Sequence, residues 1–413
     1  MDHAEPIRLR EHRIKRRDIE RDALRVLRRL YDFGFHAYLV GGSVRDLLLD
    51  RQPKDFDVVT SARPAEIRRL FRRCRLIGRR FRLAHILGEN GLVIETATFR
   101  AKPAPNGETT LIVDDNQFGT PASDAHRRDF TVNALFYDPA TDEVIDYVGG
   151  LADLDARVLR TIGDPVVRFR EDPVRMLRAA KFAARLGFSL DDAGREAVLA
   201  ERGELCKAAV PRLYEELIRM LWSGGAAASI TLLDELRLLE LLVPELCGYF
   251  ARTGEAGHAI VRALLEGIDR RFADDAPTPH GLLLAALYWP MFRALIEAMP
   301  QRPSLDDHRP LAEALTLPIA RRLSVPRRTI ETVVRVLEGQ FRIERPPNRR
   351  GGRAALARDP EYDAIATFAK LRAEAGDLTD GHHAAWRAQL DEHVPGDPEH
   401  KRGRPRRRRR RGS

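Results

Sequence analysis

Apolar positions in the first third of the chain form short runs separated by segments with helical spacing. AYLV, ending at Val40, and DFDVV, residues 55–59, have the length and pattern of strands. Residues 19–30 instead carry apolar side chains three and four positions apart, which predicts an amphipathic helix closed by Gly34. Because strand and helix patterns interleave as far as residue 150, this part predicts an α/β or α+β domain.

From residue 172 onward the pattern is helical throughout. Apolar residues recur at three- and four-residue spacing in DPVRMLRAAKFAARLGF, VPRLYEELIRMLW, AASITLLDELRLLELLVPEL and AIVRALLEGIDRRF. Residues 270–395 continue as helices punctuated by proline, and we identify no candidate site residues there. Residues 102–124 hold Pro, Gly, Asn and acids without any period, which predicts a loop. We therefore expect a mixed domain followed by helical domains.

The composition limits the class of protein. With 413 residues, 44% of them hydrophobic and 32% charged, the chain is globular and long enough for two or three domains. No apolar run approaches the ~20 residues that span a bilayer, and MDHAEPIRLREHRIKRR lacks the apolar stretch of a secretory signal. The three cysteines are scattered and lack metal-site spacing. We expect reduced cysteines, no zinc site and a cytoplasmic protein.

The formal net charge of +9 is concentrated in one segment. KRGRPRRRRRRGS, residues 401–413, holds nine basic residues and no acid, so the rest of the chain is formally neutral. A run of like charges interrupted by Gly and Pro cannot fold alone and is typical of a flexible arm that binds nucleic acid through phosphates. An anionic membrane surface and simple solubility are the alternative interpretations, and we favour nucleic acid.

The segment KDFDVVT, residues 54–60, places two acids inside an otherwise apolar strand pattern. Alternation puts Asp55 and Asp57 on one face and Phe56 and Val58 on the other, toward a core. Neighbouring carboxylates repel and raise each other's pKa, and a cation bound between them relieves the repulsion. Carboxylate oxygens suit Mg²⁺, which keeps several waters and completes its shell with phosphates. A solvated strand edge is the structural alternative.

Three further segments carry residues suited to nucleotide binding. In LVGGSVRD two glycines between a strand and a helix let the backbone approach phosphate, next to an arginine. HRRDFTVNAL adds two arginines and a third acid, and EDPVRMLR opens a helix with Asp172 as its expected N-cap. Each segment alone fits a helix cap or surface ion pair equally well. The candidate residues are Gly41, Gly42, Arg45, Arg127, Arg128, Asp129, Asn133, Asp172, Arg175 and Arg178.

The four motifs in this order resemble a known family. A GG turn with arginine, a DxD strand, RRDFTVNAL and EDPVRMLRAAKFAARLG follow one another as in the bacterial class II template-independent nucleotidyltransferases, which include poly(A) polymerases and CCA-adding tRNA nucleotidyltransferases. The resemblance covers about residues 35–250. It implies an α+β, polymerase-β-like head with a mixed sheet, followed by all-α neck and body domains. The expected bounds are 1–34 for a basic N-terminal segment and helix, 35–165 for the head, 166–250 for the neck, 251–395 for the body and 396–413 for a disordered arginine-rich tail.

The resemblance also implies a reaction. An RNA 3′-hydroxyl attacks the α-phosphorus of ATP and pyrophosphate leaves, with two Mg²⁺ ions held by Asp55 and Asp57. Two ions usually need a further carboxylate, for which Asp129 is the first candidate by resemblance and Glu95, on an expected neighbouring strand, is the rival. The glycines and arginine of LVGGSVRD would contact the triphosphate, and the arginines of RRDF the sugar or phosphates.

Base selection would fall to the EDPVR helix. The Asp172 carboxylate can accept a hydrogen bond from an exocyclic amine, and Arg175 can donate one to the adjacent ring nitrogen. Adenine and cytosine both present this pattern, whereas uracil and guanine present a carbonyl and a ring N–H, which are costly to bury against it. The pair therefore leaves poly(A) synthesis and CCA addition both open.

Two features favour poly(A) synthesis. RLIGRRFRLAHI, residues 75–86, is similar to the LxGRRFRLAH segment of bacterial poly(A) polymerases, and the arginine-rich arm resembles theirs. We predict a poly(A) polymerase acting on the 3′ ends of mRNA, small RNA or tRNA, with RNA-degradation or RNA-chaperone proteins as further partners and no membrane association. A CCA-adding or A-adding tRNA nucleotidyltransferase is the first alternative. A non-catalytic RNA-binding protein is the second, and magnesium-dependent incorporation of labelled ATP would exclude it.

Overall fold

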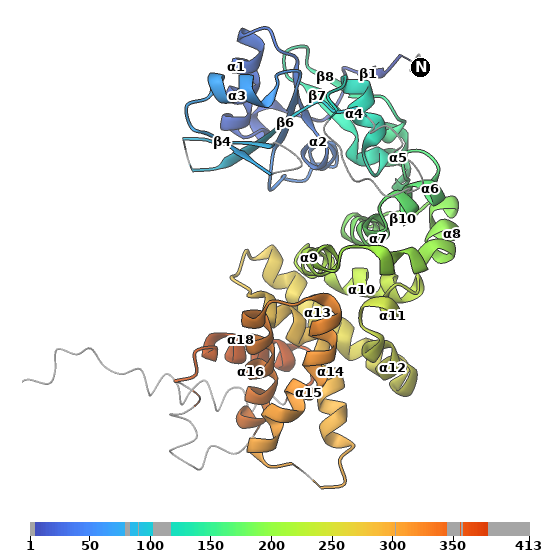
Figure 1. Ribbon diagram of the computed structural model, residues 1–413, viewed down its shortest axis with the longest axis vertical. Coiled ribbons are helices and arrows are strands. Elements are labelled where there is room, and N and C mark those ends of the chain that lie inside the picture. Colours follow the sequence, from blue (N-terminus) through green and yellow to red (C-terminus); the bar gives the residue numbers. More distant parts are fainter. Residues whose placement is uncertain are drawn as a thin grey trace, which may run out of the picture. The chain divides into compact units, whose positions relative to one another are not determined.

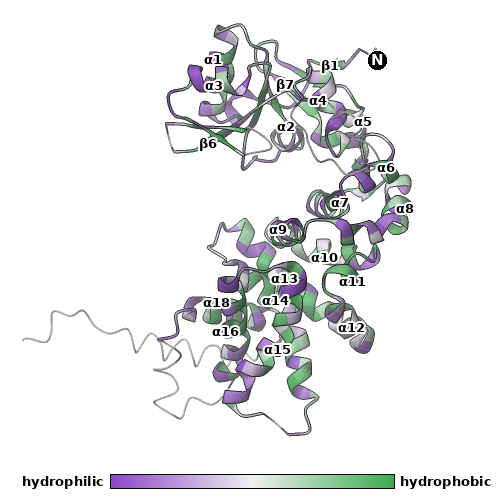
Figure 2. Cartoon of the chain, viewed as in Figure 1, coloured by the Kyte–Doolittle hydropathy of each residue, from purple (hydrophilic) through white to green (hydrophobic). Residues whose placement is uncertain are grey.

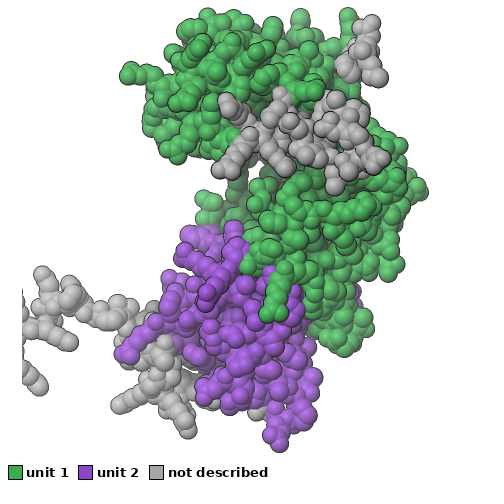
Figure 3. All heavy atoms as spheres, in the orientation of Figure 1, with its two compact units in different colours: residues 1–254, 268–275, 321–325 green, residues 255–267, 276–320, 326–413 purple. Residues whose placement is uncertain are grey.

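The computed structural model describes residues 5–78, 83–89, 91–101, 117–301, 303–344, 356 and 358–378. The chain divides into two compact units (Figure 3). Unit 1 comprises residues 1–254, 268–275 and 321–325, and unit 2 comprises residues 255–267, 276–320 and 326–413. Unit 1 therefore contains all four motifs. The domain boundaries expected from the sequence remain predictions.

A mixed sheet forms the centre of the first part of unit 1 (Figure 1). In the described residues it has eight strands in the order β1-β8-β7-β2-β3-β6-β5-β4, and β3 and β6 are its one parallel pair. This mixed sheet with its helices confirms the α+β fold class. The strands are β1 (Ile7–Leu9), β2 (Ala37–Val40), β3 (Asp57–Thr60), β4 (Cys74–Ile77), β5 (Leu83–Leu87), β6 (Val93–Thr98), β7 (Leu135–Asp138) and β8 (Glu143–Asp146).

The strand predicted over residues 55–59 begins two residues later than expected, because Asp55 and Phe56 precede β3. The alternation of faces still holds. Phe56 and Val58 are buried in the core, whereas Asp55 and Asp57 are exposed. Val40, the last residue of β2, pairs with Asp57, so the turn that follows β2 lies beside the first acid of β3.

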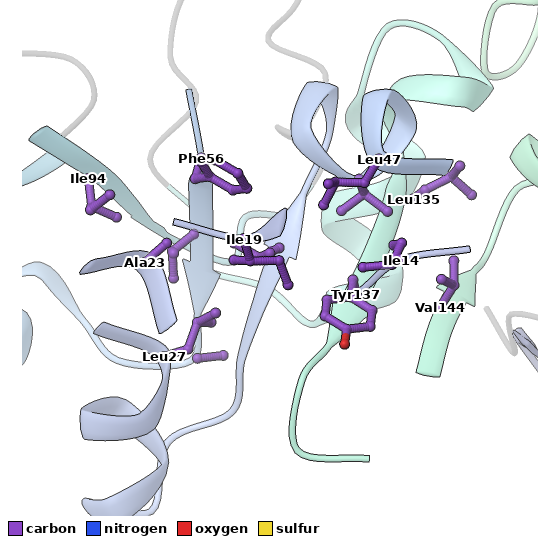
Figure 4. Packing of buried hydrophobic residues seen from close by; sticks show 14 of the residues in the cluster. Ile14, Ile19, Ala23, Leu27, Leu47, Phe56, Ile94, Leu135, Tyr137 and Val144 are labelled. Atoms are coloured by element: carbon purple, nitrogen blue, oxygen red, sulfur yellow. The ribbon is translucent and has the colours of Figure 1, made fainter. Parts of the chain in front are cut away.

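Helix α1 (Arg21–Asp32) confirms the helix predicted from the spacing of residues 19–30. Its buried side chains, including Ala23 and Leu27, pack in one hydrophobic core with Phe56, which directly precedes β3, and with Ile94 of β6 (Figure 4). Gly34 has a φ of 81°, and its amide and the next one donate hydrogen bonds to carbonyls in the last turn of α1. This left-handed glycine ends the helix as the sequence predicts.

Four more helices belong to the sheet region: α2 (Gly42–Leu48), α3 (Pro64–Leu70), α4 (Pro121–Arg127) and α5 (Gly150–Ala156). A short 3₁₀ helix, η2 (Thr131–Asn133), follows α4. Because α4 begins at Pro121, the loop predicted over residues 102–124 is wrong for its last four residues. Residues 102–116 of that prediction lie outside the described residues.

The rest of unit 1 is helical apart from a two-stranded parallel pair, β9 (Val158–Leu159) and β10 (Ser189–Leu190). Helix α7 packs against both α9 and α10. The last turns of α13 (Glu255–Ala273) also belong to unit 1. The remaining helices are α6 (Pro165–Glu171), α7 (Val174–Leu186), α8 (Asp192–Glu201), α9 (Val210–Leu221), α10 (Ala226–Glu235), α11 (Leu239–Leu242) and α12 (Pro244–Thr253).

Unit 2 is built from the first part of α13 and from α14 (His280–Glu297), most of α15 (Leu305–Leu323), α16 (Arg327–Ile343) and α18 (Tyr362–Glu374). Its core centres on Trp289, which the buried Arg372 guanidinium covers at 3.9 Å from the ring centroid. Apolar residues alternate with polar ones along the helices of both units (Figure 2). No helix within the described ranges is long and apolar enough to cross a membrane.

Candidate active site

A pocket of about 600 Å³ opens in unit 1 between the sheet region and the helices that follow it. The β2–α2 turn, the start of β3, the segment from α4 to η2, and helix α7 all contribute to its lining. The structure therefore brings most of the predicted site residues together, although they come from distant parts of the sequence. Those that line the pocket are Gly41, Gly42, Arg45, Asp55, Asp57, Arg128, Asp129, Asn133 and Arg178.

The acids of the DxD segment face this pocket. Asp57 reaches solvent through the open pocket. Its partial burial and the negative charges of Glu95 and Asp55 raise its pKa to about 6, although the positive charge of Arg128 acts to lower this pKa. A carboxylate held at so high a pKa gains from a bound cation. The shared face of Asp55 and Asp57 thus has the electrostatic property expected of a metal-binding pair.

Glu95 lies next to Asp57 on the neighbouring strand. β3 and β6 run parallel with Val58 opposite Thr96, so the residues that precede these two, Asp57 and Glu95, share the next position of the ladder and the same face. Glu95 is exposed, and its Oε1 lies 3.4 Å from His85 Nε2. Strand pairing therefore supplies a third carboxylate beside the DxD acids.

Asp129, the other candidate for a third carboxylate, is occupied by donors. Arg178 donates to Asp129 Oδ2 from Nε at 2.7 Å and also from Nη2, the Phe130 amide donates to Oδ1 at 2.9 Å, and Asn133 Nδ2 donates to Oδ1 at 3.4 Å. Burial alone would raise the pKa of Asp129, but the Arg178 guanidinium and these hydrogen bonds lower it to about 2. This geometry favours a positioning role for Asp129 and Glu95 as the third metal carboxylate, and both roles stay predictions.

The turn between β2 and α2 requires its first glycine. Gly41 has a φ of 75°, and a Cβ at this position would lie 3.3 Å from Arg128 Nη1. Arg128 donates to the Asp124 carboxylate at 2.9 Å from Nη2, and Arg127 donates to the same carboxylate at 3.1 Å. Asp124 thus orients both arginines of the RRDF motif, but of the two only Arg128 lines the pocket.

Arg45 lines the pocket from beneath the glycine turn and is almost fully buried, with only 1% of its area exposed. Its Nε donates to Asp46 Oδ1 at 2.8 Å and its Nη1 to Asn133 Oδ1 at 2.5 Å. Burial lowers the pKa of Arg45, and the Asp46 carboxylate opposes that effect. Asp46 also accepts a hydrogen bond from Arg185 of α7 at 3.3 Å, so α2 and α7 are joined below the turn.

The predicted base-reading pair does not line the pocket. Asp172 pairs with Arg212 at 2.8 Å, and Arg175 donates to the Arg168 carbonyl at 2.9 Å and to Glu171 at 3.3 Å. The expectation that Asp172 caps α7 is wrong, because Pro173 occupies the N-cap position. Asp172 Oδ2 accepts from Arg212 instead, and no donor of α7 reaches its Oδ1. The role of the pair in base selection stays a prediction.

Sequence reasoning missed several residues of the lining. Lys181, Phe182 and Arg185 follow Arg178 at three, four and seven positions, which places them on the same face of α7, so helical spacing could have identified them. Trp222 and Phe272 also line the pocket, but they come from the ends of α9 and α13 and no local motif marks them. Residues 79–82, which include all of the GRRF segment except Gly78, and the arm of residues 401–413 lie outside the described residues.

Comparisons with known proteins agree with this geometry. The family model described as the poly A polymerase head domain matches residues 37–160, and the one described as the probable RNA and SrmB-binding site of polymerase A matches residues 187–249. The chain is 39% identical over 379 residues to poly(A) polymerase I of Escherichia coli O6:H1 (strain CFT073), covering 88% of this chain and 80% of that one.

More distant similarity extends to CCA-adding enzymes. The chain is 37% identical over 238 residues to the CCA-adding enzyme of Bacillus velezensis, covering 57% of this chain and 58% of that one. The crystal structure of the Bacillus stearothermophilus CCA-adding enzyme in complex with CTP matches with a TM-score of 0.66 at 25% identity, over 90% of this chain and 82% of that one. The resemblance deduced from the four motifs is confirmed. This chain belongs to the poly(A) polymerase family of nucleotidyltransferases.

Proposed function

We propose that this nucleotidyltransferase adds AMP from ATP to RNA 3′ ends without a template and releases pyrophosphate. The observation that carries the proposal is the arrangement of Asp55 and Asp57 beside the Gly41–Gly42 turn and Arg128, in a chain 39% identical to a poly(A) polymerase over most of its length. Carboxylates for cations, a close-approach backbone and a guanidinium are what a nucleoside triphosphate requires of its site.

Asp55 and Asp57 are the residues that would hold two Mg²⁺ ions, with Glu95 as the third carboxylate. The raised pKa of Asp57 fits this role, because a cation would favour its ionised form. Across the described ranges no three or more acidic, histidine or cysteine side chains are gathered so that they could hold a metal ion together, the DxD acids and Glu95 included. Triphosphate oxygens and waters would therefore supply much of each ion's shell. When bound, the ions would lower the pKa of the attacking hydroxyl and stabilise charge on the leaving pyrophosphate.

The chain's own residues divide into contacting and positioning groups. Arg128 faces the pocket and would contact the triphosphate directly, held in place by Asp124. Arg45 is too deeply buried to enclose a phosphate, so it acts by fixing Asn133 and supporting the Gly42 backbone from below. Asp129 fixes Arg178 at the pocket wall in the same way.

Base selection by Asp172 and Arg175 requires an exchange of partners. Asp172 Oδ2 accepts from Arg212, whereas Asp172 Oδ1 is buried and accepts no hydrogen bond within the part of the chain that the structure describes. A buried acceptor without a donor is unfavourable, and an exocyclic amine would satisfy it. Arg175 would then release the Arg168 carbonyl to donate to the ring nitrogen. Both adenine and cytosine satisfy this pair.

The CCA-adding reaction is the second candidate, because CCA-adding enzymes appear among both the sequence relatives and the solved structures. The family model over residues 187–249 is described as the probable RNA and SrmB-binding site of polymerase A, which supports RNA as a partner and is compatible with a protein partner. The proposal therefore includes mRNA, small RNA or tRNA as acceptor, RNA-degradation or RNA-chaperone proteins as partners, and a cytoplasmic location.

The test is incorporation of labelled nucleotide into an oligo(A) primer, with ATP and CTP in separate reactions. We expect many additions of AMP that require Mg²⁺ and stop with EDTA, and poor incorporation of CMP. Asp57→Asn should abolish addition, whereas Asp155→Asn, which removes an exposed acid of α5 outside the pocket, should not. Equal or better use of CTP on this primer would contradict selective adenosine addition, and no incorporation of either nucleotide would refute the proposal.

A further inference from the structure

An aromatic pair in the pocket has no part in nucleotide binding as described above. The rings of Trp222 and Phe272 meet edge to face, with centroids 5.2 Å apart and planes at 83°, and both residues line the pocket. Neither side chain is fully buried. Partly exposed aromatic rings in a polar, charged pocket are available to stack on a ligand.

The backbone around the pair holds Phe272 in this place. Asp269, one turn earlier in α13, accepts hydrogen bonds from the amides of Ala226 at 2.7 Å and Ala227 at 3.2 Å, at the start of α10. Gly224 has a φ of 77°, and a Cβ there would come within 2.8 Å of the Phe272 ring. The end of α13 is therefore anchored so that Phe272 packs against the turn that follows Trp222.

Contacts within unit 1 join the aromatic pair to one end of the DxD segment and the glycine turn to the other end. Lys54, which directly precedes Asp55, lies with its ammonium 3.6 Å from the Phe272 ring centroid. At the other end of the segment, Asp57 pairs with Val40, which directly precedes the glycine turn. A series of neighbours thus leads from the glycine turn through Asp57, Asp55 and Lys54 to the aromatic pair.

This order has a chemical meaning for phosphoryl transfer, in which the attacking and leaving oxygens lie roughly in line across phosphorus. With the triphosphate against the glycine turn, a 3′-hydroxyl in line with the leaving oxygen would approach from the other end of the DxD segment, which contacts the aromatic pair. Unpaired RNA bases stack on aromatic side chains with little dependence on sequence. Lys54 and Arg219, with side chains 52% and 62% exposed, lie on that side, each in a loose ion pair: Lys54 with Asp275 at 3.9 Å, and Arg219 with Glu215 at 3.8 Å. Exposed ion pairs this long are weak, so RNA phosphates can compete for both cations.

We propose that Trp222, Phe272 and Lys54 form the subsite for the 3′-terminal nucleotide of the acceptor RNA. The base stacks on the ring pair, and Lys54 contacts the phosphate of that nucleotide. The cation–π contact between Lys54 and Phe272 is weak at an exposed position, so a base can replace the ammonium on the ring. This subsite rests on the proposed function, and it suits an enzyme that starts on varied RNA ends and continues on adenosine.

The experiment measures RNA binding without ATP, in EDTA, so it does not depend on catalysis. A 5′-labelled oligo(A) is compared, by fluorescence anisotropy, with the same oligonucleotide whose 3′-terminal ribose lacks its base. The unaltered protein should bind the abasic RNA about tenfold more weakly, within the range of stacking one base on aromatic rings. Trp222→Leu and Phe272→Leu should bind intact RNA about tenfold more weakly and lose the discrimination between the two RNAs.

Matched variants separate stacking from folding. Phe272→Tyr keeps a ring and should keep the discrimination, and Phe33→Leu removes an aromatic ring that is 57% exposed outside the pocket and should change nothing. Equal binding of the two RNAs by the unaltered protein would overturn the subsite, as would full discrimination in folded Phe272→Leu. Discrimination by a protein that incorporates no nucleotide would support the subsite while refuting the polymerase activity, so the two failures are distinguishable.

Discussion

Asp129→Asn separates two roles that one carboxylate could have in this pocket. In the structure Asp129 neutralises Arg178, with its side chain 10% exposed and that of Arg178 32% exposed. Asparagine keeps the shape but removes the charge, and one orientation of its amide directs N–H groups at the Arg178 donors. If Asp129 positions Arg178, the substitution should destabilise unit 1 and leave divalent-metal binding intact.

The size of the effect follows from the pKa of Asp129. The native environment lowers this pKa from 3.8 to about 2, and a tenfold change in an acid dissociation constant corresponds to about 1.4 kcal/mol of stabilisation of the ionised form. The Asp129 charge therefore contributes about 2 kcal/mol at neutral pH. Because the folded pKa lies below the unfolded one, this contribution is complete above about pH 4 and is lost as the pH falls toward 2.

The assay is urea unfolding followed by circular dichroism, with hydrogen exchange of α7 peptides assigning the change to unit 1. Asp129→Asn should lower the free energy of unfolding by about 2 kcal/mol between pH 5 and 7, and the difference should narrow below pH 4. Asp155→Asn is the control, since it removes an exposed acid and should change stability by less than about 0.5 kcal/mol. Mn²⁺ binding, followed by electron paramagnetic resonance, should be unchanged in both variants.

The opposite outcome would refute the positioning role. An Asp129→Asn protein that is as stable as the unaltered one but binds Mn²⁺ at least about tenfold more weakly would identify Asp129 as a metal ligand. In that case Glu95→Gln should leave Mn²⁺ affinity unchanged, whereas the structure predicts that Glu95→Gln weakens it.

Three further predictions concern the acids, the arm and the glycine turn. Asp55→Ala or Asp57→Ala should slow single-turnover nucleotide addition by about 10³-fold or more with the fold intact, because the clamp on attacking and leaving oxygens is lost; near-normal turnover would remove this assignment. Deleting residues 401–413 should weaken RNA binding and leave the selection of ATP unaltered. Because the arm holds nine basic residues and each released counterion contributes about 0.7, the slope of log affinity against log salt should become smaller in magnitude by up to about six. An unchanged slope would mean that the arm has another role. Gly41→Ala should destabilise the protein by about 1–2 kcal/mol and raise the KM for ATP, because φ at this position is 75° and the methyl group meets Arg128; an unaltered KM would mean that the turn does not contact the triphosphate.

Local patterns in the sequence predict those parts of the site that local structure determines. The spacing of apolar residues and the position of Gly34 predict α1. Both signals, an apolar face and a terminating glycine, lie within the helix segment itself. Alternation predicts that Asp55 and Asp57 face the same side. Both line the pocket in the structure, although β3 begins only at Asp57. The position of Glu95 beside Asp57 depends on the pairing of β3 with β6. The sequence suggests that these strands are neighbours, but it does not give the register of the pair.

Contacts between distant segments are what the sequence does not predict. Arg178 follows Asp129 by 49 positions, and nothing local indicates that it occupies that carboxylate. Phe272 reaches the pocket because Asp269 anchors α13 to α10, a long-range contact with no motif of its own. Asp172 does not cap α7 because its carboxylate pairs with Arg212, 40 positions later in the chain. Helix propensity describes only local sequence and does not predict such a pair.

The most direct test of the central claim is product analysis with two acceptors, an oligo(A) and a tRNA that lacks its CCA end, each given ATP and CTP together. The proposed base-reading pair, Asp172 and Arg175, would admit both bases, so the acceptor and the pocket would have to decide the product. A poly(A) polymerase extends both acceptors with long runs of adenosine and little cytidine. Addition of two cytidines and one adenosine to the tRNA, with the oligo(A) left unextended, would contradict poly(A) synthesis and identify the CCA-adding reaction instead.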